Sequence, residues 1–191
     1  MIGVDRKWLG HGQDDAILAA EIDAAARLTG AFKLRSGQFS SEYFDKYRFE
    51  ADPALLERLA LKMLPLIPSG TEVLAGLELG GVPIATAMSL AAGLPLAFVR
   101  KKAKEYGTFQ AVEGAGINGR RVVLVEDVIT TGGAVADAER LVRETGGEVL
   151  GVVCAIWRGD GSPRINASPG LLVRAAFTKE DLDQENNRRG L

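Results

Sequence analysis

Residues 121–134 decide the fold of this chain, and they read RVVLVEDVITTGGA. The stretch begins with a run of β-branched and apolar residues, which is typical of a buried strand. Two carboxylates, Glu126 and Asp127, follow the run, and a short Thr-Thr-Gly-Gly turn comes soon after them. Apolar residues then repeat at helical spacing over residues 133–145. The stretch therefore predicts a strand, a turn and a helix in close succession.

The turn has the chemistry of a phosphate site. Gly132 and Gly133 let backbone amides point into one concavity, and the helix N-terminus adds a partial positive charge. The hydroxyl groups of Thr130 and Thr131 add further donors. The two preceding carboxylates would repel a phosphate, whereas they suit sugar hydroxyls or the water around a magnesium ion. Together these features predict a ribose 5-phosphate site, although the turn alone is also typical of an ordinary polar helix cap.

Strands and helices alternate along the rest of the chain. Asp52-Pro53 is typical of a helix start, because aspartate caps the first turn and proline fits its first position. The hydrophobic pattern predicts helices at residues 14–28, 83–92 and 133–145, of which the first is ended by Gly30 and the second by Gly93. It predicts strands at residues 72–79, 96–101, 121–125, 147–157 and 171–177. This alternation predicts an α/β fold with a doubly wound, mostly parallel sheet, whose ligands bind beyond the carboxyl ends of the strands.

Length and composition are those of one globular domain. The chain has 191 residues, of which 47% are hydrophobic and 25% charged, and its formal net charge is -2. This charge gives no general reason to bind nucleic acid or an anionic membrane. No apolar stretch reaches the roughly 18 residues that cross a membrane, and the first residues lack a signal-peptide pattern. We therefore expect a single cytoplasmic domain, residues 1–191, with neither nucleic acid nor membrane as a partner.

Cysteine and histidine chemistry has little support in the sequence. Cys154, the single cysteine, lies in an apolar run and is expected to be a buried core thiol rather than a nucleophile. His11, the single histidine, lies in a polar N-terminal segment. This argues against a Ser-His-Asp triad and against a metal site built from several histidines.

The strand, acidic pair, Thr/Gly turn and helix of residues 121–134 resemble the signature of the type I phosphoribosyltransferases, which bind 5-phosphoribosyl-1-pyrophosphate (PRPP). The stretch lacks the Gly-Lys-Ser/Thr ending of a Walker A loop and the GxGxxG of dinucleotide-binding proteins. The resemblance implies that Glu126 and Asp127 hold the ribose hydroxyls. It also implies PRPP contacts for the residues that follow: Val128, Ile129, Thr130, Thr131, Gly132, Gly133 and Ala134.

A basic segment, residues 99–107, reads VRKKAKEYG and resembles the catalytic loop of the orotate phosphoribosyltransferases. The resemblance places Arg100, Lys101 and Lys104 on the pyrophosphate, where clustered positive charge suits a highly charged leaving group. Tyr106 stands where the family loop has a histidine. A tyrosine is a poor base at neutral pH because its ordinary pKa is about 10, so more of the burden falls on Lys104. Without the resemblance, the segment is equally typical of a solvated basic loop.

The N-terminal segment FKLRSGQFSSEYFD, residues 32–45, resembles the part of the same family that holds the base. Arg35 falls at a basic position that is usually lysine, and Tyr43 and Phe44 fall at an aromatic pair suited to stacking on a flat pyrimidine. The alternative is that these aromatic residues belong to the core of a hairpin. The resemblance implies a small N-terminal hood, about residues 1–50, over a PRPP-binding core of about residues 51–180.

Two shorter segments complete the resemblance. Arg158 follows the strand predicted at residues 147–157, and its bidentate guanidinium suits the orotate carboxylate; Thr130 is also expected at the orotate. Residues 76–83, GLELGGVP, match the family's pyrophosphate loop, with the amides of Gly80 and Gly81 facing pyrophosphate. Many relatives carry a lysine where this chain has Gly80, so that cation is missing here.

These segments extend from about residue 30 to Arg158. The resemblance implies Mg²⁺-dependent transfer of ribose 5-phosphate from PRPP to orotate, which gives orotidine 5′-monophosphate and pyrophosphate in pyrimidine (UMP) biosynthesis. Lys104, Glu126 and Asp127 are the expected catalytic residues, and magnesium is expected mainly on PRPP and water near the acidic pair. The resemblance also implies a homodimer in which Lys104 of one subunit serves the Asp127 site of the other.

Two other functions stay open. Purine and uracil phosphoribosyltransferases share the PRPP signature, and only Arg158 and residues 32–45 favour orotate over their bases. A PRPP-sensing regulator would keep the fold and bind nucleic acid, for which it would need a basic surface or an added domain. The net charge of -2 offers little support for such a surface.

Overall fold

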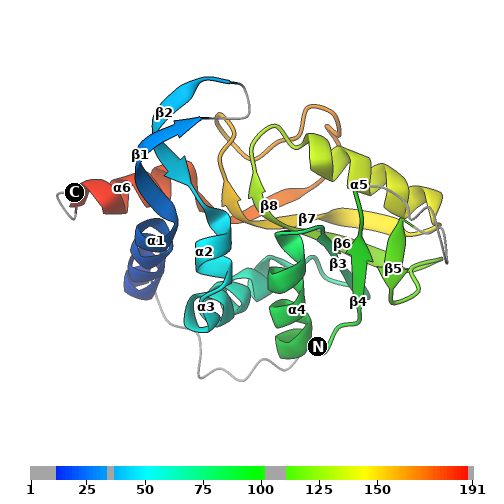
Figure 1. Cartoon of the computed structure of the whole chain (residues 1–191). Helices are drawn as coiled ribbons and strands as arrows, with labels where there is room; N and C mark the ends of the chain where they lie inside the picture. The colour runs from blue at the N-terminus through cyan, green and yellow to red at the C-terminus, as the bar shows by residue number, and fades with distance from the viewer. Residues whose placement is uncertain (1–11, 34–36, 102–110, 189–191) are drawn as a thin grey trace.

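The computed structural model describes residues 12–33, 37–101 and 111–188. A six-stranded sheet lies at its centre, with the strands in the order β5-β4-β3-β6-β7-β8 (Figure 1). These strands are β3 (Val73–Leu77), β4 (Leu96–Val99), β5 (Val112–Gly114), β6 (Arg121–Ile129), β7 (Glu148–Trp157) and β8 (Val173–Thr178). Neighbouring strands are parallel except for β4 and β5, which are antiparallel. The predicted α/β fold with a mostly parallel sheet is therefore confirmed.

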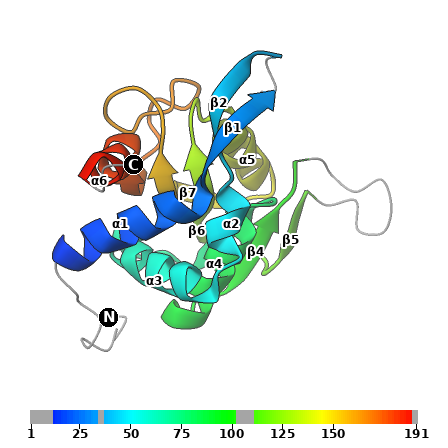
Figure 2. The same ribbon diagram turned by 60° about the vertical axis from the view of Figure 1, so that its left-hand side comes forward.

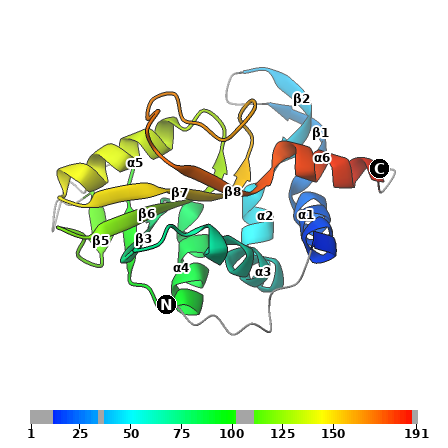
Figure 3. The ribbon, with the colours of Figure 1, turned by 180° about the vertical axis from the view of Figure 1, so that it is seen from behind.

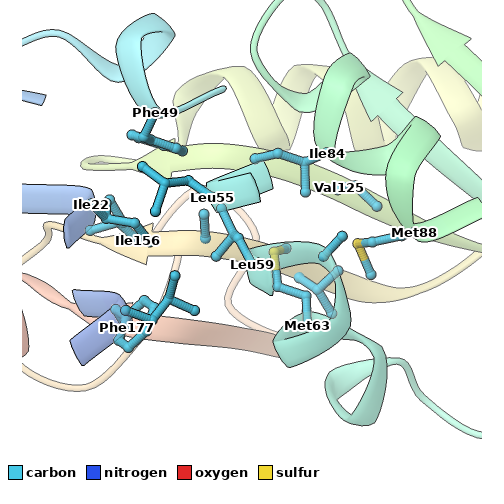
Figure 4. Packing of buried hydrophobic residues seen from close by; sticks show 14 of the residues in the cluster. Ile22, Phe49, Leu55, Leu59, Met63, Ile84, Met88, Val125, Ile156 and Phe177 are labelled. Carbon is cyan, nitrogen blue, oxygen red and sulfur yellow. The ribbon is translucent and has the colours of Figure 1, made fainter. Parts of the chain in front are cut away.

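Helices cover both faces of this sheet. Helix α5 (Gly133–Glu144) lies on one face, and α3 (Pro53–Met63) and α4 (Gly81–Ala92) lie on the other (Figure 1). Figure 4 shows the second face, where Leu59 and Met63 of α3 and Met88 of α4 pack in one buried cluster. Each face of the sheet thus has its own apolar core, which is the arrangement of a doubly wound fold.

Side chains along β6 alternate between these two cores. Val123 and Val125 pack with α3 and α4, whereas Val122 and Leu124 pack with α5. The alternation follows from the pleat of a strand, in which successive side chains point to opposite faces. Strand β6 continues to Ile129, four residues beyond the predicted strand end at Val125, because it stays paired with β7 through Ile129.

The N-terminal part forms a small sheet of its own. Helix α1 (Gly12–Ala26) leads into β1 (Arg27–Lys33), which pairs antiparallel with β2 (Phe39–Phe44). This hairpin projects away from the central sheet, and the short helix α2 (Lys46–Glu50) leads back toward it (Figure 2).

The predicted end of the first helix was wrong. The helix was expected over residues 14–28 with Gly30 after it, but it ends at Ala26. Arg27 and Leu28 instead pair with Phe44 and Tyr43 across the hairpin, and Gly30 lies inside β1. Pairing with a strand more than ten residues away decided the conformation here, which local periodicity does not register.

Two other predicted helix ends, the start of α3 and the end of α4, agree with the structure. The carboxylate of Asp52 accepts hydrogen bonds from the backbone N–H groups of Ala54, at 2.9 Å, and Leu55, at 3.1 Å, so the predicted cap of α3 is confirmed. Helix α3 continues into a 3-10 turn, η2 (Leu64–Leu66). Gly93 ends α4 with a left-handed φ of 68°, a conformation that glycine adopts without steric cost.

The last helix, α6 (Lys179–Arg188), packs beside α1 at the other end of the chain (Figure 3). Arg27 links the two helices and the hairpin, because its guanidinium pairs with Asp23 at 2.8 Å, Glu42 at 2.9 Å and Asp183 at 2.7 Å. The C-terminal helix therefore braces the base of the hairpin.

Two further findings concern a membrane-spanning helix and the single cysteine. Within residues 12–33, 37–101 and 111–188, no helix combines the length and apolar character needed to cross a membrane. Cys154 is fully buried in β7, and burial raises the pKa of its thiol, so the predicted core thiol is confirmed.

Candidate active site

A pocket of about 410 Å³ lies at the carboxyl ends of β3, β4 and β6. Parallel strands present these ends at one edge of the sheet, so the segments that follow them converge there. Six of the residues predicted to bind PRPP line the pocket: Arg100, Lys101, Glu126, Asp127, Val128 and Ala134. The edge of the sheet that the sequence indicated is therefore hollowed, and it holds both the acidic pair and basic side chains.

The acidic pair lies near the carboxyl end of β6, inside the strand rather than after it. Glu126 is 8% exposed and Asp127 is fully buried. The backbone N–H of Asp127 donates to Glu126 Oε1 at 3.1 Å, and the N–H of Val128 donates to Asp127 Oδ1. The two carboxyl groups line the same pocket. Asp127 shares the face on which α2 and α4 lie.

The two carboxyl groups differ in charge. Burial, together with the neighbouring Asp127, raises the pKa of Glu126 to about 9. Burial would also raise the pKa of Asp127, but the hydrogen bond with Glu126 and the ion pair with Lys46 outweigh it and lower that pKa. In the ligand-free chain at neutral pH, Glu126 is thus a donor and Asp127 an acceptor. A pair of this kind matches a hydroxyl group, which both donates and accepts.

Lys46 is the counter-charge of Asp127. Its Nζ atom pairs with Asp127 Oδ2, and the side chain is 32% exposed. Glu50 lies buried on the same short helix, and neither of its carboxyl oxygens has a hydrogen-bond partner among the described residues. Burial and the negative charge of Asp127 raise the pKa of Glu50 to about 8. Asp127, a firmly ionised carboxylate, thus meets the Lys46 ammonium group and two carboxyl groups, Glu126 and Glu50, that favour the neutral form.

The Thr/Gly turn joins β6 to α5 with its polar groups outward. Thr130, Thr131 and Gly133 are exposed, and Gly132 is buried with a left-handed φ of 77°. A Cβ atom at Gly132 would lie 2.6 Å from the side chain of Ile165, so glycine is required for space as well as for conformation. The first N–H groups of α5 have no partner within the helix, and with the threonine hydroxyls they can bind a phosphate.

Gly80 and Gly81 begin α4 against the acidic pair. A Cβ atom at Gly81 would overlap the carbonyl oxygen of Val125. One at Gly80 would overlap Asp127 Oδ2 and would lie 3.1 Å from Lys46 Nζ. The two glycines therefore let the start of α4 approach the end of β6.

The basic segment begins on the wall of the pocket. Arg100 lies 3.7 Å from Glu113 across the β4–β5 pair, measured between Nη1 and Oε1. The backbone N–H of Lys101 donates to Glu78 Oε1 at 2.7 Å. Lys104 and Tyr106 lie outside the described residues, and so does Arg35 of the predicted base site.

Two of the predicted base-site residues, Arg158 and Phe44, are in contact. Arg158 follows β7, and its backbone N–H donates to the carbonyl oxygen of Ile129 at 2.8 Å. Its guanidinium lies over the ring of Phe44, while Tyr43, on the same strand, stacks at a tilt on Phe32 with ring centroids 5.6 Å apart. Arg158, Phe44 and Tyr43 do not line the 410 Å³ pocket, and neither do the turn residues from Thr130 to Gly133.

Sequence reasoning missed several residues of the pocket: Lys46, Tyr47, Glu78 and Asp137. Asp137 carried a usable signal, because it lies one helical turn after Gly133 and so faces the same side of α5. Glu78 lies directly after β3, at the edge of the sheet where ligands are expected. Lys46 follows the Tyr43-Phe44 pair by two residues, yet nothing in its spacing to Asp127, 81 positions later, indicates that the two meet.

Known proteins with similar sequences and structures agree with this geometry. The family described as a phosphoribosyl transferase domain matches residues 48–170. An orotate phosphoribosyltransferase of a Nocardioides species is 60% identical over 169 residues, which cover 88% of this chain and 94% of that relative.

Solved structures give the same result. The orotate phosphoribosyltransferase of Mycobacterium tuberculosis H37Rv, in complex with Fe(III) dicitrate, has a TM-score of 0.76 and 31% identity, covering 88% of this chain and 98% of that one. The same enzyme in complex with PRPP has a TM-score of 0.73 and 30% identity, covering 89% of this chain and 99% of that one. With a family match over more than half of its residues and a close relative along most of its length, the chain belongs to the orotate phosphoribosyltransferase family of phosphoribosyl transferases.

Proposed function

We propose that this chain transfers ribose 5-phosphate from PRPP to orotate, giving orotidine 5′-monophosphate and pyrophosphate in pyrimidine biosynthesis. The observation that carries the proposal is the arrangement at the end of β6. An ionised Asp127 and a neutral Glu126 lie on one side of the Thr/Gly turn, and Arg100 and Lys101 line the same pocket. Ribose hydroxyls, a 5-phosphate and a pyrophosphate need these three kinds of partner.

The chain's own residues position the substrate rather than react with it. Asp127 accepts a hydrogen bond from a ribose hydroxyl, and Glu126 donates one. The turn from Thr130 to Gly133 and the first amides of α5 hold the 5-phosphate. As the bond from ribose C1 to pyrophosphate breaks, C1 gains oxocarbenium character, and the orotate nitrogen N1 forms the new bond. Arg100 and Lys101 stabilise the negative charge that collects on the leaving pyrophosphate.

The donor set suits magnesium that is held by the substrate. In the described part of the chain, no group of three or more histidine, cysteine or acidic side chains is placed to hold a metal by itself. The carboxyl oxygens of Glu126 and Asp127 are hard donors that can bind water on Mg²⁺. When bound, the ion would supply positive charge to the pyrophosphate, and Glu126 and Asp127 would hold it through its water molecules.

The base is assigned to the group formed by Arg158, Phe44 and Tyr43. Arg158 provides a bidentate partner for the orotate carboxylate, and the two rings provide flat apolar surface for the pyrimidine. Thr130 lies at the end of β6, next to Ile129, whose carbonyl oxygen binds the backbone of Arg158. The turn therefore connects the phosphate site with the base site.

The proposal includes a homodimer in the cytoplasm, with Lys104 of each subunit acting in the site of the other. It also keeps the division into an N-terminal hood, about residues 1–50, and a core, about residues 51–180. The support for the hood is the β1–β2 hairpin, which carries Tyr43 and Phe44 to the end of β7.

Base selectivity tests this function. Initial rates of pyrophosphate release, with PRPP and Mg²⁺ fixed, are compared for orotate, uracil, adenine and hypoxanthine. The proposal expects orotate to be used at least tenfold faster than the other bases. A preference for uracil or a purine would mean that the chain is a uracil or purine phosphoribosyltransferase instead. Retardation of DNA or RNA at low salt, without turnover of any base, would favour the PRPP-sensing regulator.

A further inference from the structure

Position 80 has no room for a side chain because the Asp127 carboxyl group already occupies that space. A Cβ atom at Gly80 would overlap the Asp127 carboxyl group, and it would lie 3.1 Å from Lys46 Nζ. The backbone of Gly80 has φ -65° and ψ -32°, which any residue can adopt. Glycine is thus required here by the position of Asp127 and not by backbone conformation.

Lys46 places an ammonium group at the same point. It comes from α2, the short helix after the hairpin, and it reaches Asp127 from the face of the sheet that α2 and α4 share. Lys46 lines the 410 Å³ pocket together with Arg100 and Lys101, so the three cationic residues border the same space. The chain therefore has a lysine nitrogen next to position 80, although the lysine belongs to another element.

The ion pair with Asp127 leaves part of the hydrogen-bonding capacity of the Lys46 ammonium group unused. A lysine ammonium has three N–H donors, and the ion pair with Asp127 Oδ2 uses only part of them. The Lys46 side chain is still 32% exposed, whereas Asp127 is fully buried. Within this ion pair, the lysine is therefore the group that a ligand can reach. A cation in this position can hold Asp127 and bind a second anionic oxygen from the pocket.

We propose that the ammonium group of Lys46 donates to the pyrophosphate of PRPP while it pairs with Asp127. The proposal rests on the PRPP-dependent function above. It makes Gly80 and Lys46 a matched pair: the glycine leaves room for Asp127, and Asp127 orients the lysine. Pyrophosphate then meets cations from two sides, Lys46 on one and Arg100 and Lys101 on the other.

The test compares two ligands that differ only by the pyrophosphate. Binding of PRPP and of ribose 5-phosphate, each with Mg²⁺ and without a base, is measured by calorimetry for the wild-type chain and Lys46→Ala. We expect Lys46→Ala to weaken PRPP binding at least tenfold and ribose 5-phosphate binding less than threefold. Lys46→Arg, which keeps the charge, should bind PRPP within about fivefold of wild type.

Lys62→Ala is the matched control. Lys62 is also a partly buried lysine in an ion pair, with Asp15 at 2.8 Å, but it lies outside the 410 Å³ pocket and should leave both affinities unchanged. If Lys46→Ala does not fold, Lys46→Gln provides the same comparison at nearly the same side-chain length.

Equal weakening of both ligands would overturn the proposal, because Lys46 would then act only by holding Asp127. Unchanged PRPP binding would overturn it as well. Neither result would affect the proposed function, which fails only if the wild-type chain does not use PRPP and orotate.

Discussion

The guanidinium carbon of Arg158 lies 4.8 Å from the centroid of the Phe44 ring. This contact joins the end of β7 to the N-terminal hairpin, two segments that are more than a hundred residues apart. An arginine over an aromatic face is held in place and keeps the edge of its guanidinium available. The contact thus orients a carboxylate-binding fork beside an aromatic wall.

Arg158→Ala should raise the KM for orotate at least tenfold and the KM for PRPP less than threefold. The reason is that the guanidinium pairs with the carboxylate of the base and not with PRPP. Steady-state rates with each substrate varied in turn give both constants. Arg143→Ala, on the exposed side of α5, is the control. A similar rise in both KM values would show that Arg158 is structural.

Asp127→Asn should lower kcat/KM at least tenfold, equivalent to about 1.4 kcal/mol of transition-state stabilisation. It removes the charge that accepts the ribose hydroxyl and leaves Lys46 without its counter-ion. Glu126→Gln should cost less, because an amide resembles the neutral carboxyl group that a pKa of about 9 implies. Circular dichroism should show that both variants are folded. Wild-type rates in Asp127→Asn would refute the role of the acidic pair.

Gly80→Ala should lower kcat/KM at least tenfold through a single methyl group. The new Cβ atom would overlap Asp127 Oδ2 and move the carboxylate from its place beside Lys46. Gly116→Ala is the matched control, because a Cβ atom there meets nothing within 4 Å. Equal values of kcat/KM in the two variants would mean that the Asp127 carboxylate can move from this position without loss of activity.

The central part of the fold was predictable from the sequence because its signals are local. The apolar run of β6, the Asp52-Pro53 cap and the Gly93 stop each act within a few residues. The start of the hairpin's first strand was not predictable, because Arg27 and Leu28 have the pattern of a helix end until β2 pairs with them. The acidic pair and the turn could be located, but the partners of Asp127 could not. Lys46 and Glu50 reach it only through the tertiary fold.

The stability of the ligand-free chain should fall as pH rises from about 5 to 8. Burial raises the pKa of Glu50 from 4.5 to about 8, so the folded chain binds a proton that the unfolded chain has lost over this range. The free energy of unfolding then decreases by at most about 1.4 kcal/mol per pH unit from this group. Glu50→Gln should make the decrease shallower, as measured by urea unfolding between pH 5.5 and 8. If the free energy of unfolding of Glu50→Gln and of the wild-type chain fell in parallel with pH, the raised pKa of Glu50 would be contradicted.

A mixture of two inactive variants should regain activity if the sites are shared. Lys104→Ala and Asp127→Asn are each expected to be nearly inactive. When they are unfolded and refolded together, about half of the dimers are heterodimers by random pairing, and each has one intact site. Activity should recover to about a quarter of the wild-type value. No recovery, with heterodimers verified by mass, would refute the shared site and leave PRPP use unaffected.

The central claim is that the chain joins orotate to the ribose of PRPP, and the loss of orotate absorbance tests it most directly. With PRPP and Mg²⁺ present, the wild-type chain should consume orotate and release one pyrophosphate for each orotidine 5′-monophosphate formed. Omission of PRPP or addition of a chelator should stop the reaction, and Asp127→Asn should slow it at least tenfold. A constant orotate absorbance with folded wild-type chain, PRPP and Mg²⁺ would contradict the account.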